Sequence, residues 1–191
     1  MRLPFLRLAR IRALHRQQRG LTLLELVMGL AVVAVLFGIA LPEFGALLQR
    51  QRLVAAQHAL SGSFHLARTH AITQRVNTAV CPSHDGQRCA SGGVWDAGWL
   101  VYADRNRNGQ LDADEPVLQV QQRKTDGVRL RSSAARPQAV FRPQGSSGGS
   151  GGSNLSLNLC DARGELHQRL VLNNSGRLRR EAGSGRPPVC A

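Results

Sequence analysis

A single carboxylate inside a long apolar run is the group in this sequence with the clearest chemical consequence. Glu25 lies in the stretch 21–41, which is otherwise apolar apart from Thr22 and small glycines. The run is long enough to cross a bilayer as a helix, and an acid inside a membrane needs a partner. Cleavage after Gly20 would supply one, because the new ammonium group on Leu21 of one copy would pair with Glu25 of another. The alternative to cleavage is an uncleaved single-pass anchor. For Glu25, the alternative is that it forms only a capping box with Thr22 in its own helix.

A second group of oxygen-bearing side chains has the spacing of a calcium loop. The segment 104–115 fits D-x-[DN]-x-[DN]-G-x₅-E, a pattern of alternating donors, a turning glycine and a distal glutamate. The candidate ligands are Asp104, Asn106, Asn108 and Glu115. A strand pattern precedes this segment and Pro116 follows it, so no pair of helices frames the loop. A tight polar hairpin loop is therefore the favoured interpretation, with no metal, and calcium is the alternative.

Arginines gather near the C-terminus, where six of them stand against two glutamates after Asp161. Asn173 to Gly176 has the composition of a turn. In an extended segment after it, Arg177 and Arg179 point to the same side. With Arg180 they are candidate phosphate ligands, because guanidinium groups bind phosphates bidentately. The alternative is a solvated face that reflects composition, since only one of the 25 basic residues is a lysine.

The sequence lacks the residue patterns of an enzyme. None of the six histidines has metal-ligand spacing, and there is no nucleophile elbow, phosphate loop or pair of catalytic carboxylates. We therefore expect neither enzymatic activity nor a cofactor.

Four cysteines predict two disulfides in an exported domain. Three connectivities exist for four cysteines. We favour Cys81–Cys89, which closes a short loop, and Cys160–Cys190, which fastens the C-terminal tail.

The elements that position these groups begin with a basic leader. Residues 1–20 hold six arginines and no acid, whereas the whole chain of 191 residues has a net charge of +13. A basic flank before an apolar span follows the positive-inside pattern. It predicts a single-pass protein of the inner membrane, with a cytoplasmic N-terminus and a periplasmic globular domain. The leader is residues 1–20 and the membrane helix is residues 21–41.

Beyond the membrane span, the sequence predicts an α+β domain. Apolar residues recur at helical spacing from Leu53 to Ala71, so residues 42–76 continue the helix as an amphipathic segment. Residues 77–191 form a β-rich domain with an arginine-rich tail. Its short runs of Val, Leu and aromatic residues predict antiparallel strands over 78–81, 99–103, 117–121, 128–131, 139–142, 155–159 and 169–172. The glycine-rich segment 145–154 is predicted to be a flexible loop.

The N-terminal residues resemble the signature of type IV pilin precursors. The matching run is Gly20-Leu21-Thr22-Leu23-Leu24-Glu25, followed by Pro42. The family usually has Phe directly after the cleavage point, where this chain has Leu21. Downstream, the chain is similar to the GspH/FimT family of minor pseudopilins, which includes the type II secretion system protein H. The similar segments are Val80-Cys81-Pro82-Ser83, Trp95, Gly98-Trp99-Leu100-Val101, Cys160-Asp161-Ala162-Arg163-Gly164 and Ser175-Gly176-Arg177-Leu178-Arg179.

This resemblance implies both processing and assembly. A prepilin peptidase would cleave after Gly20 and methylate Leu21. An inner-membrane assembly platform would then move the chain into a filament with other major and minor pilins or pseudopilins. The segment after Gly176 resembles the DNA-binding tail of FimT-type minor pilins, which adds double-stranded DNA as a candidate partner.

The expected function is that of a non-enzymatic minor subunit of a type IV pilus or a type II secretion pseudopilus. It would act in filament initiation or tip assembly and bind DNA for uptake through its arginine-rich tail. The alternative is a purely structural type II secretion pseudopilin that serves protein export without binding DNA.

Overall fold

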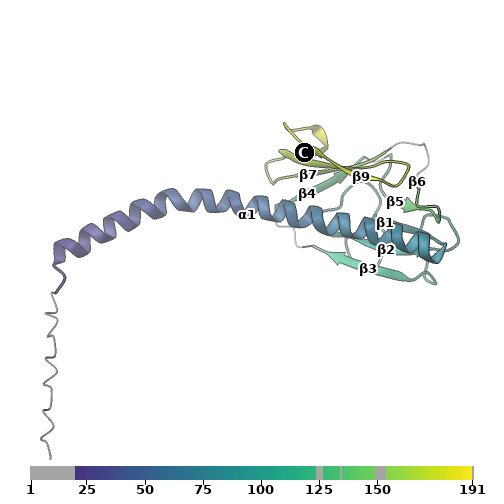
Figure 1. Cartoon of the computed structure of the whole chain (residues 1–191), viewed down its shortest axis with the longest axis horizontal. Helices are drawn as coiled ribbons and strands as arrows, with labels where there is room; N and C mark the ends of the chain where they lie inside the picture. Colours follow the sequence, from purple (N-terminus) through teal and green to yellow (C-terminus); the bar gives the residue numbers. More distant parts are fainter. Residues whose placement is uncertain (1–19, 124–126, 134, 149–153, 191) are drawn as a thin grey trace, which may run out of the picture. The chain divides into compact units, whose positions relative to one another are not determined.

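The computed structural model describes residues 20–123, 127–133, 135–148 and 154–190, without the side chains of residues 39–43. The chain divides into two compact units, one ending at Glu43 and the other beginning at Phe44. Helix α1 (Leu23–Gln74) supplies residues to both units, and all the strands belong to the second (Figure 1). This arrangement confirms the predicted α+β class.

In the first unit, α1 has a capped start and an apolar surface. The backbone N–H of Glu25 donates a hydrogen bond to Thr22 Oγ1 at 3.2 Å, which satisfies one of the N–H groups that a helix end leaves unpaired. The large apolar side chains described in this unit are exposed, and Leu23 reaches 81%. Among the described residues, no helix is both long and apolar enough to cross a membrane. The predicted span over 21–41 includes residues whose side chains lie outside the description.

In the second unit, one face of α1 is buried. The stripe that the sequence predicts consists of Leu53, Ala56, Leu60, Phe64, Ala67 and Ala71, each at most 6% exposed. These residues form one core cluster with apolar side chains from strands, among them Trp99 and Leu157. The helix ends at Gln74, and Arg75 follows it with a positive φ of 54°, a conformation common just after helix ends.

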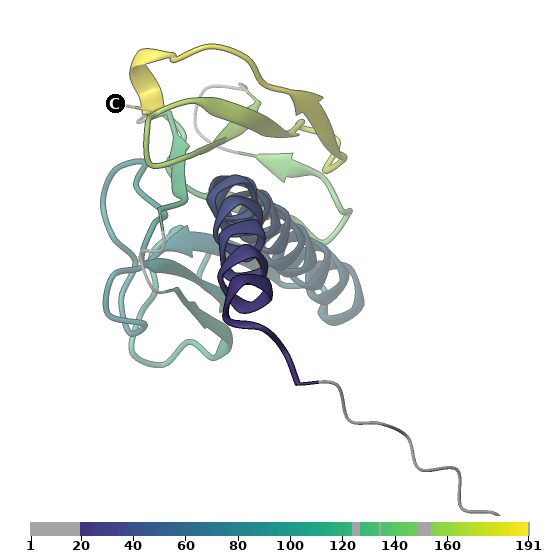
Figure 2. The same cartoon turned by 90° about the vertical axis from the view of Figure 1, so that its left-hand side faces the viewer.

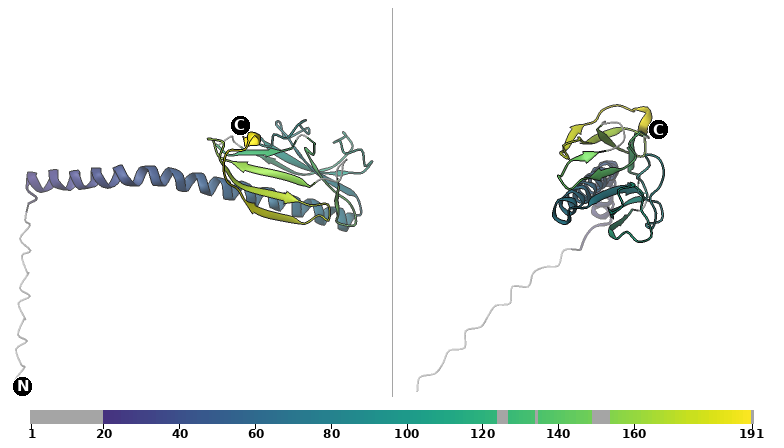
Figure 3. Two further views of the ribbon diagram at one scale, coloured as in Figure 1. Left: turned by 90° about the horizontal axis from the view of Figure 1, so that it is seen from above. Right: turned by 90° about the vertical axis from the view of Figure 1, so that its right-hand side faces the viewer.

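Two antiparallel sheets enclose the core. The first has the order β3-β2-β1-β5-β6 and the second β4-β7-β8-β9. The first sheet is built from β1 (Asn77–Pro82), β2 (Gly98–Asp104), β3 (Val117–Gln122), β5 (Ala139–Phe141) and β6 (Ser147–Gly148). The second is built from β4 (Arg129–Ser132), β7 (Leu155–Cys160), β8 (Leu166–Leu172) and β9 (Leu178–Ala182), and a short 3₁₀ helix, η1 (Pro188–Cys190), follows it. Figures 2 and 3 show the teal strands and the green-to-yellow strands on different sides of the helix segment in this unit.

All seven predicted strands are present in the described residues. Strand β9 lies in the extended segment predicted after Gly176, and β6 was not predicted. Strand β6 falls inside the segment that we predicted to be a flexible loop, and that prediction is wrong at Ser147 and Gly148, which pair with β5. Ser147 is 1% exposed, its N–H donates to the Asn174 carbonyl at 2.9 Å, and its hydroxyl accepts from Arg136 Nη2 at 2.6 Å. These partners are distant in sequence, so local composition gave no sign of them. Residues 149–153 of the same segment lie outside the described part of the chain.

The predicted disulfides are confirmed. Cys81–Cys89 joins β1 to the loop that follows it, with a Cα–Cα distance of 5.5 Å. Cys160–Cys190 joins β7 to η1, with a Cα–Cα distance of 5.8 Å. The second bridge therefore holds the C-terminal segment against the second sheet.

Buried hydrogen bonds connect α1 to the first sheet. Trp99 Nε1 donates to Ser63 Oγ at 2.8 Å, and both residues are at most 1% exposed. The Ser63 hydroxyl also lies 2.8 Å from Gln119 Oε1, which it can reach as a donor. A serine on the helix thus satisfies an indole N–H that has no access to water.

Candidate functional site

The processing and assembly residues lie at the start of the first unit. Gly20 and Leu21 are exposed and precede α1, and Glu25 is in the first turn of the helix. The Glu25 backbone is used by the Thr22 cap, while its carboxylate makes no hydrogen bond or ion pair with a described residue. A negatively charged group in the first helical turn is favourable toward the helix dipole, and it remains available to a second molecule.

Two of the three candidate DNA-binding arginines lie at the start of the edge strand of the second sheet, Arg179 within β9 and Arg177 directly before it. Arg177 and Arg179 are exposed, whereas Leu178 between them is half-buried and packs against the core. This alternation agrees with the extended segment predicted there. Arg179 Nη2 forms an exposed ion pair with Glu181 Oε1 at 2.9 Å.

Arg180 belongs to a different surface. It is paired with the buried Leu170 of β8, so it points to the same side of the sheet as Leu178. There it lines a polar cavity of about 420 Å³ with α1 residues that include His58 and His65. The structure therefore does not bring Arg180 to the face that Arg177 and Arg179 share.

The glycine of the G-R-x-R segment has a structural explanation. Gly176 has a φ of +78°, and a Cβ at this position would lie 2.1 Å from the carbonyl oxygen of Gly145. Both the left-handed backbone and the close approach of a second backbone require glycine. Gly176 thus forms the turn that starts β9, and it carries no information about a ligand.

The strand register brings two further arginines, Arg131 and Arg169, into one row on the second sheet. One row of paired residues crosses the four strands of the second sheet and consists of Arg131, Asn158, Arg169 and Glu181. Arg131 is ion-paired with Asp96, and Arg169 Nε donates to Asn158 Oδ1 at 2.9 Å. Alternation along β4 was visible in the sequence, but the order of strands that aligns Arg131 and Arg169 with Glu181, two positions after Arg179, was not.

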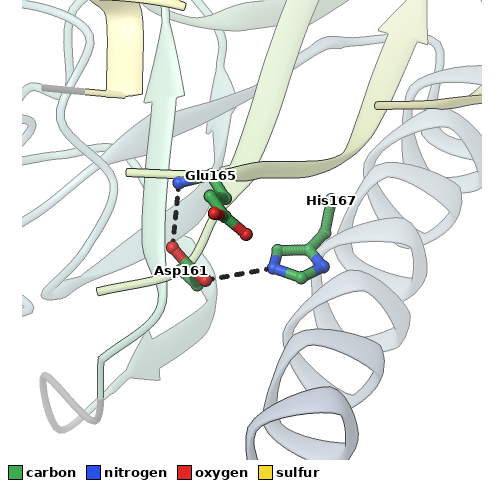
Figure 4. Close-up of side chains that lie close together, drawn as sticks. All are labelled: Asp161, Glu165 and His167. Carbon is green, nitrogen blue, oxygen red and sulfur yellow. Dashed lines mark hydrogen bonds and ion pairs between the residues drawn. The ribbon is translucent and has the colours of Figure 1, made fainter. Parts of the chain in front are cut away.

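A cluster of three titratable side chains lies at the β7–β8 turn (Figure 4). Ligand atoms of Asp161, Glu165 and His167 lie within 4.8 Å of one another. Asp161 Oδ1 accepts the N–H groups of Arg163 and Glu165, each at 2.9 Å, and its Oδ2 lies 3.3 Å from His167 Nε2. Burial raises the pKa of Asp161, but these hydrogen bonds outweigh it and lower the pKa overall. The carboxylate that would have to bind a metal already closes the turn.

The candidate calcium ligands lie in the hairpin loop between β2 and β3. Asp104 is the last residue of β2. Within the loop, the backbone N–H of Asp112 donates a hydrogen bond to Glu115 Oε2 at 3.3 Å. Asn106 and Asn108 each donate a side-chain hydrogen bond to Asp112 Oδ2 at 2.7 Å. The sequence correctly predicts a polar hairpin loop, and the structure brings all these residues together.

This architecture defines a protein with the type IV pilin fold: a long N-terminal helix whose second part packs on antiparallel sheets. Comparison with known proteins agrees. Residues 15–41 match the prokaryotic N-terminal methylation motif, and residues 56–176 match the family of the type II transport protein GspH. The chain belongs to the GspH family of type IV pilin-like proteins.

Individual relatives support this assignment. The chain is 28% identical over 169 residues to the pilin-like protein PilA1 of Thermus thermophilus, which covers 86% of this chain and 99% of PilA1. Two crystal structures of the type IV minor pilin FimU of Pseudomonas aeruginosa share the fold. They are 18% and 16% identical, cover 72% and 75% of this chain and 98% of each FimU chain, and have TM-scores of 0.51 and 0.52. The protein is thus a non-enzymatic pilin or pseudopilin subunit of a type IV filament system, with the membrane-anchored N-terminus typical of that family.

Proposed function

We propose that this protein is a minor subunit that a prepilin peptidase cleaves after Gly20 and that joins its filament by pairing Glu25 with a neighbour's N-terminus. Before assembly, residues 21–41 cross the inner membrane once, with residues 1–20 in the cytoplasm and the second unit in the periplasm. An inner-membrane assembly platform then transfers the subunit to the filament, where it acts in initiation or at the tip.

The observation that carries this proposal is the uncovered apolar surface of α1 around one acid. Leu23, Leu24 and Leu26 are 81%, 69% and 55% exposed. A surface of this kind requires lipid or other apolar helices around it. Glu25 adds a negative charge that is costly in such surroundings unless a positive group neutralises it. The ammonium group of a cleaved, methylated Leu21 on the adjacent subunit has the required charge.

The test separates charge pairing from helix capping. Glu25→Ala removes the carboxylate but keeps the backbone N–H that Thr22 caps. Thr22→Val removes the capping hydroxyl but keeps the carboxylate, so it is the matched control. We expect Glu25→Ala to abolish incorporation into filaments purified from cells, and Thr22→Val to retain most of it. Normal incorporation of Glu25→Ala would contradict the pairing, and so would mature protein that still carries residues 1–20, detected by mass spectrometry.

A second candidate function is DNA binding along the edge strand β9. The specific observation in its favour is that Arg179 of this strand and Arg177, directly before it, are both exposed. The Arg177 guanidinium makes no hydrogen bond or ion pair with a described residue. Guanidinium groups placed in this way suit backbone phosphates, and binding through them would be independent of sequence and sensitive to salt.

This function is tested on a fragment that begins at Phe44. The fragment keeps the second compact unit, and every buried apolar residue described in the chain lies in it. Arg177→Ala with Arg179→Ala should weaken binding to duplex DNA and reduce the slope of log K against log [salt] by about 1.8, because each phosphate contact contributes about 0.9. Arg50→Ala with Arg88→Ala removes the same charge elsewhere and serves as the control. Equal effects of the two double variants on DNA binding would argue against a site on β9. If the parent fragment does not bind DNA at low salt, the purely structural pseudopilin is favoured.

A further inference from the structure

The hairpin loop between β2 and β3 surrounds one buried carboxylate whose bonding is incomplete. Asp104 is 1% exposed. Its Oδ2 accepts the Gly109 N–H at 3.2 Å, so the carboxylate points into the loop. Its Oδ1 is buried and has no hydrogen-bond partner among the described residues. Buried polar atoms are nearly always partnered in native proteins, so this oxygen is available to a group from outside the chain.

The other groups of the loop do not compensate this oxygen. Glu115 is also buried, at 6% exposure, and carries the same charge as Asp104. Neither carboxylate forms an ion pair with a described basic residue. The Tyr102 hydroxyl, two residues earlier on β2, is buried and also lacks a partner among the described residues. A hydrogen bond from this hydroxyl would not neutralise the negative charges of the Asp104 and Glu115 carboxylates. A cation would neutralise both.

The order of the residues specifies which cation fits. Asp104, Asn106, Asn108, Asp112 and Glu115 occupy the first, third, fifth, ninth and twelfth positions of the segment. Those are the positions that supply side-chain ligands in twelve-residue calcium loops, which also have an invariant glycine at the sixth position. Gly109 is at that position with a φ of +72°. An all-oxygen set of this size suits Ca²⁺, whereas Mg²⁺ keeps several waters and uses few protein ligands.

From the buried Oδ1 of Asp104 and this ligand order, we infer that the β2–β3 loop binds one Ca²⁺ without the helix pair that usually frames such loops. In the present conformation the carboxylates of Asp104, Asp112 and Glu115 are not gathered for a metal ion, since Asp161, Glu165 and His167 are the only such group among the described residues. Binding therefore contracts the loop. The amides of Asn106 and Asn108 leave Asp112 and turn their oxygens toward the ion.

The affinity should be that of an extracellular calcium module. Arg105 and Arg107 are exposed within the loop and reduce its negative charge. Ligand charge sets calcium affinity, and extracellular modules bind with dissociation constants of about 10⁻⁴ to 10⁻³ M.

The test is isothermal titration of calcium into the full-length protein in detergent, after removal of metal with EDTA. We expect one site per chain with a dissociation constant in that range. Glu115→Gln should weaken binding at least tenfold, and Asn106→Ala should weaken it several-fold. Asp114→Asn removes a charge from an exposed, non-ligand position of the same loop and should bind as the parent does. The Asn106 side chain is exposed, so that variant keeps the test informative if Glu115→Gln does not fold.

Terbium gives a second measurement, because energy transfer from Tyr102 should sensitise its emission when the ion occupies the loop. The inference is overturned if no saturable binding is seen at about 10 mM calcium, ten times the weakest expected dissociation constant. It is also overturned if Glu115→Gln and Asn106→Ala bind as the parent does, or if Asp161→Asn abolishes binding, which would place the ion at the β7–β8 turn.

Discussion

Removing the hydroxyl of Ser63 should destabilise the second unit more than the loss of one serine on a helix normally does. Ser63 Oγ accepts the hydrogen bond of Trp99 Nε1 at 2.8 Å, and Trp99 is 0% exposed. In Ser63→Ala this N–H stays buried with no acceptor. The other side-chain partner, Gln119, is only half-buried and can turn to water, and the Ala59 carbonyl that the hydroxyl also contacts belongs to α1 itself.

The expected size of the effect follows from these partners. A buried donor left unsatisfied costs about 1–3 kcal/mol. We expect a loss of about 2 kcal/mol in the free energy of unfolding, which lowers Tm by about 4–8 °C for a unit of this size. Replacing serine by alanine also raises helix propensity slightly. Ser61→Ala on the same helix, with no hydrogen bond to a described residue, corrects for that gain and should change stability by less than about 0.5 kcal/mol.

The assay is urea unfolding of the fragment that begins at Phe44, followed by circular dichroism, in a double-mutant cycle with Trp99→Phe. Phenylalanine has no side-chain N–H that could be left without an acceptor. Ser63→Ala should therefore cost at least about 1 kcal/mol less in the Trp99→Phe background. The reasoning fails if Ser63→Ala and Ser61→Ala are equally stable, or if the cycle shows coupling below about 0.5 kcal/mol.

Three further results are expected from the same fragment. Replacing both cysteines of Cys160–Cys190 by alanine should cost about 3.7 kcal/mol and those of Cys81–Cys89 about 2.5 kcal/mol, because chain entropy scales with the sequence separations of 30 and 8 residues; a larger loss for the shorter loop in urea unfolding would contradict this. Gly176→Ala should lower Tm by more than Gly185→Ala, since both have a positive φ but only Gly176 meets another backbone; equal shifts would leave the contact without effect. The pKa of Asp161 is lowered in the folded protein, so its carboxylate stabilises the fold fully above the unfolded pKa of about 3.9, and this contribution is lost as the pH falls through the folded pKa. Asp161→Asn should therefore make the free energy of unfolding less dependent on pH on the acid side. An unchanged pH dependence would show that Asp161 does not contribute.

Much of the fold was predictable because the relevant signals are local. The spacing of Leu53 to Ala71 identified the buried face of α1, since the helical period alone decides which residues share a face. Alternation along 155–159 identified β7 in the same way. The Cys81–Cys89 bridge closes a short loop, so proximity in sequence favoured it.

The candidate sites were predictable only in part. Residue types at Gly20, Leu21 and Glu25 carry the assembly hypothesis without any fold. For the arginines, sequence order grouped Arg180 with Arg179, but its pairing with Leu170 turns it toward α1. A one-residue step along a strand reverses the face of a side chain, and the register that fixes the face depends on β8.

The sequence by itself determined the class of protein, the long helix, the presence of two disulfides and the order of oxygen donors in the β2–β3 loop. Tertiary structure alone decided the strand order, the pairing of β6, the outward face of β9 and the burial of Asp104. The physical reason is the range of the interactions. Helical and strand periods act between residues a few positions apart, whereas burial and pairing depend on segments that meet only when the two sheets pack against one face of α1.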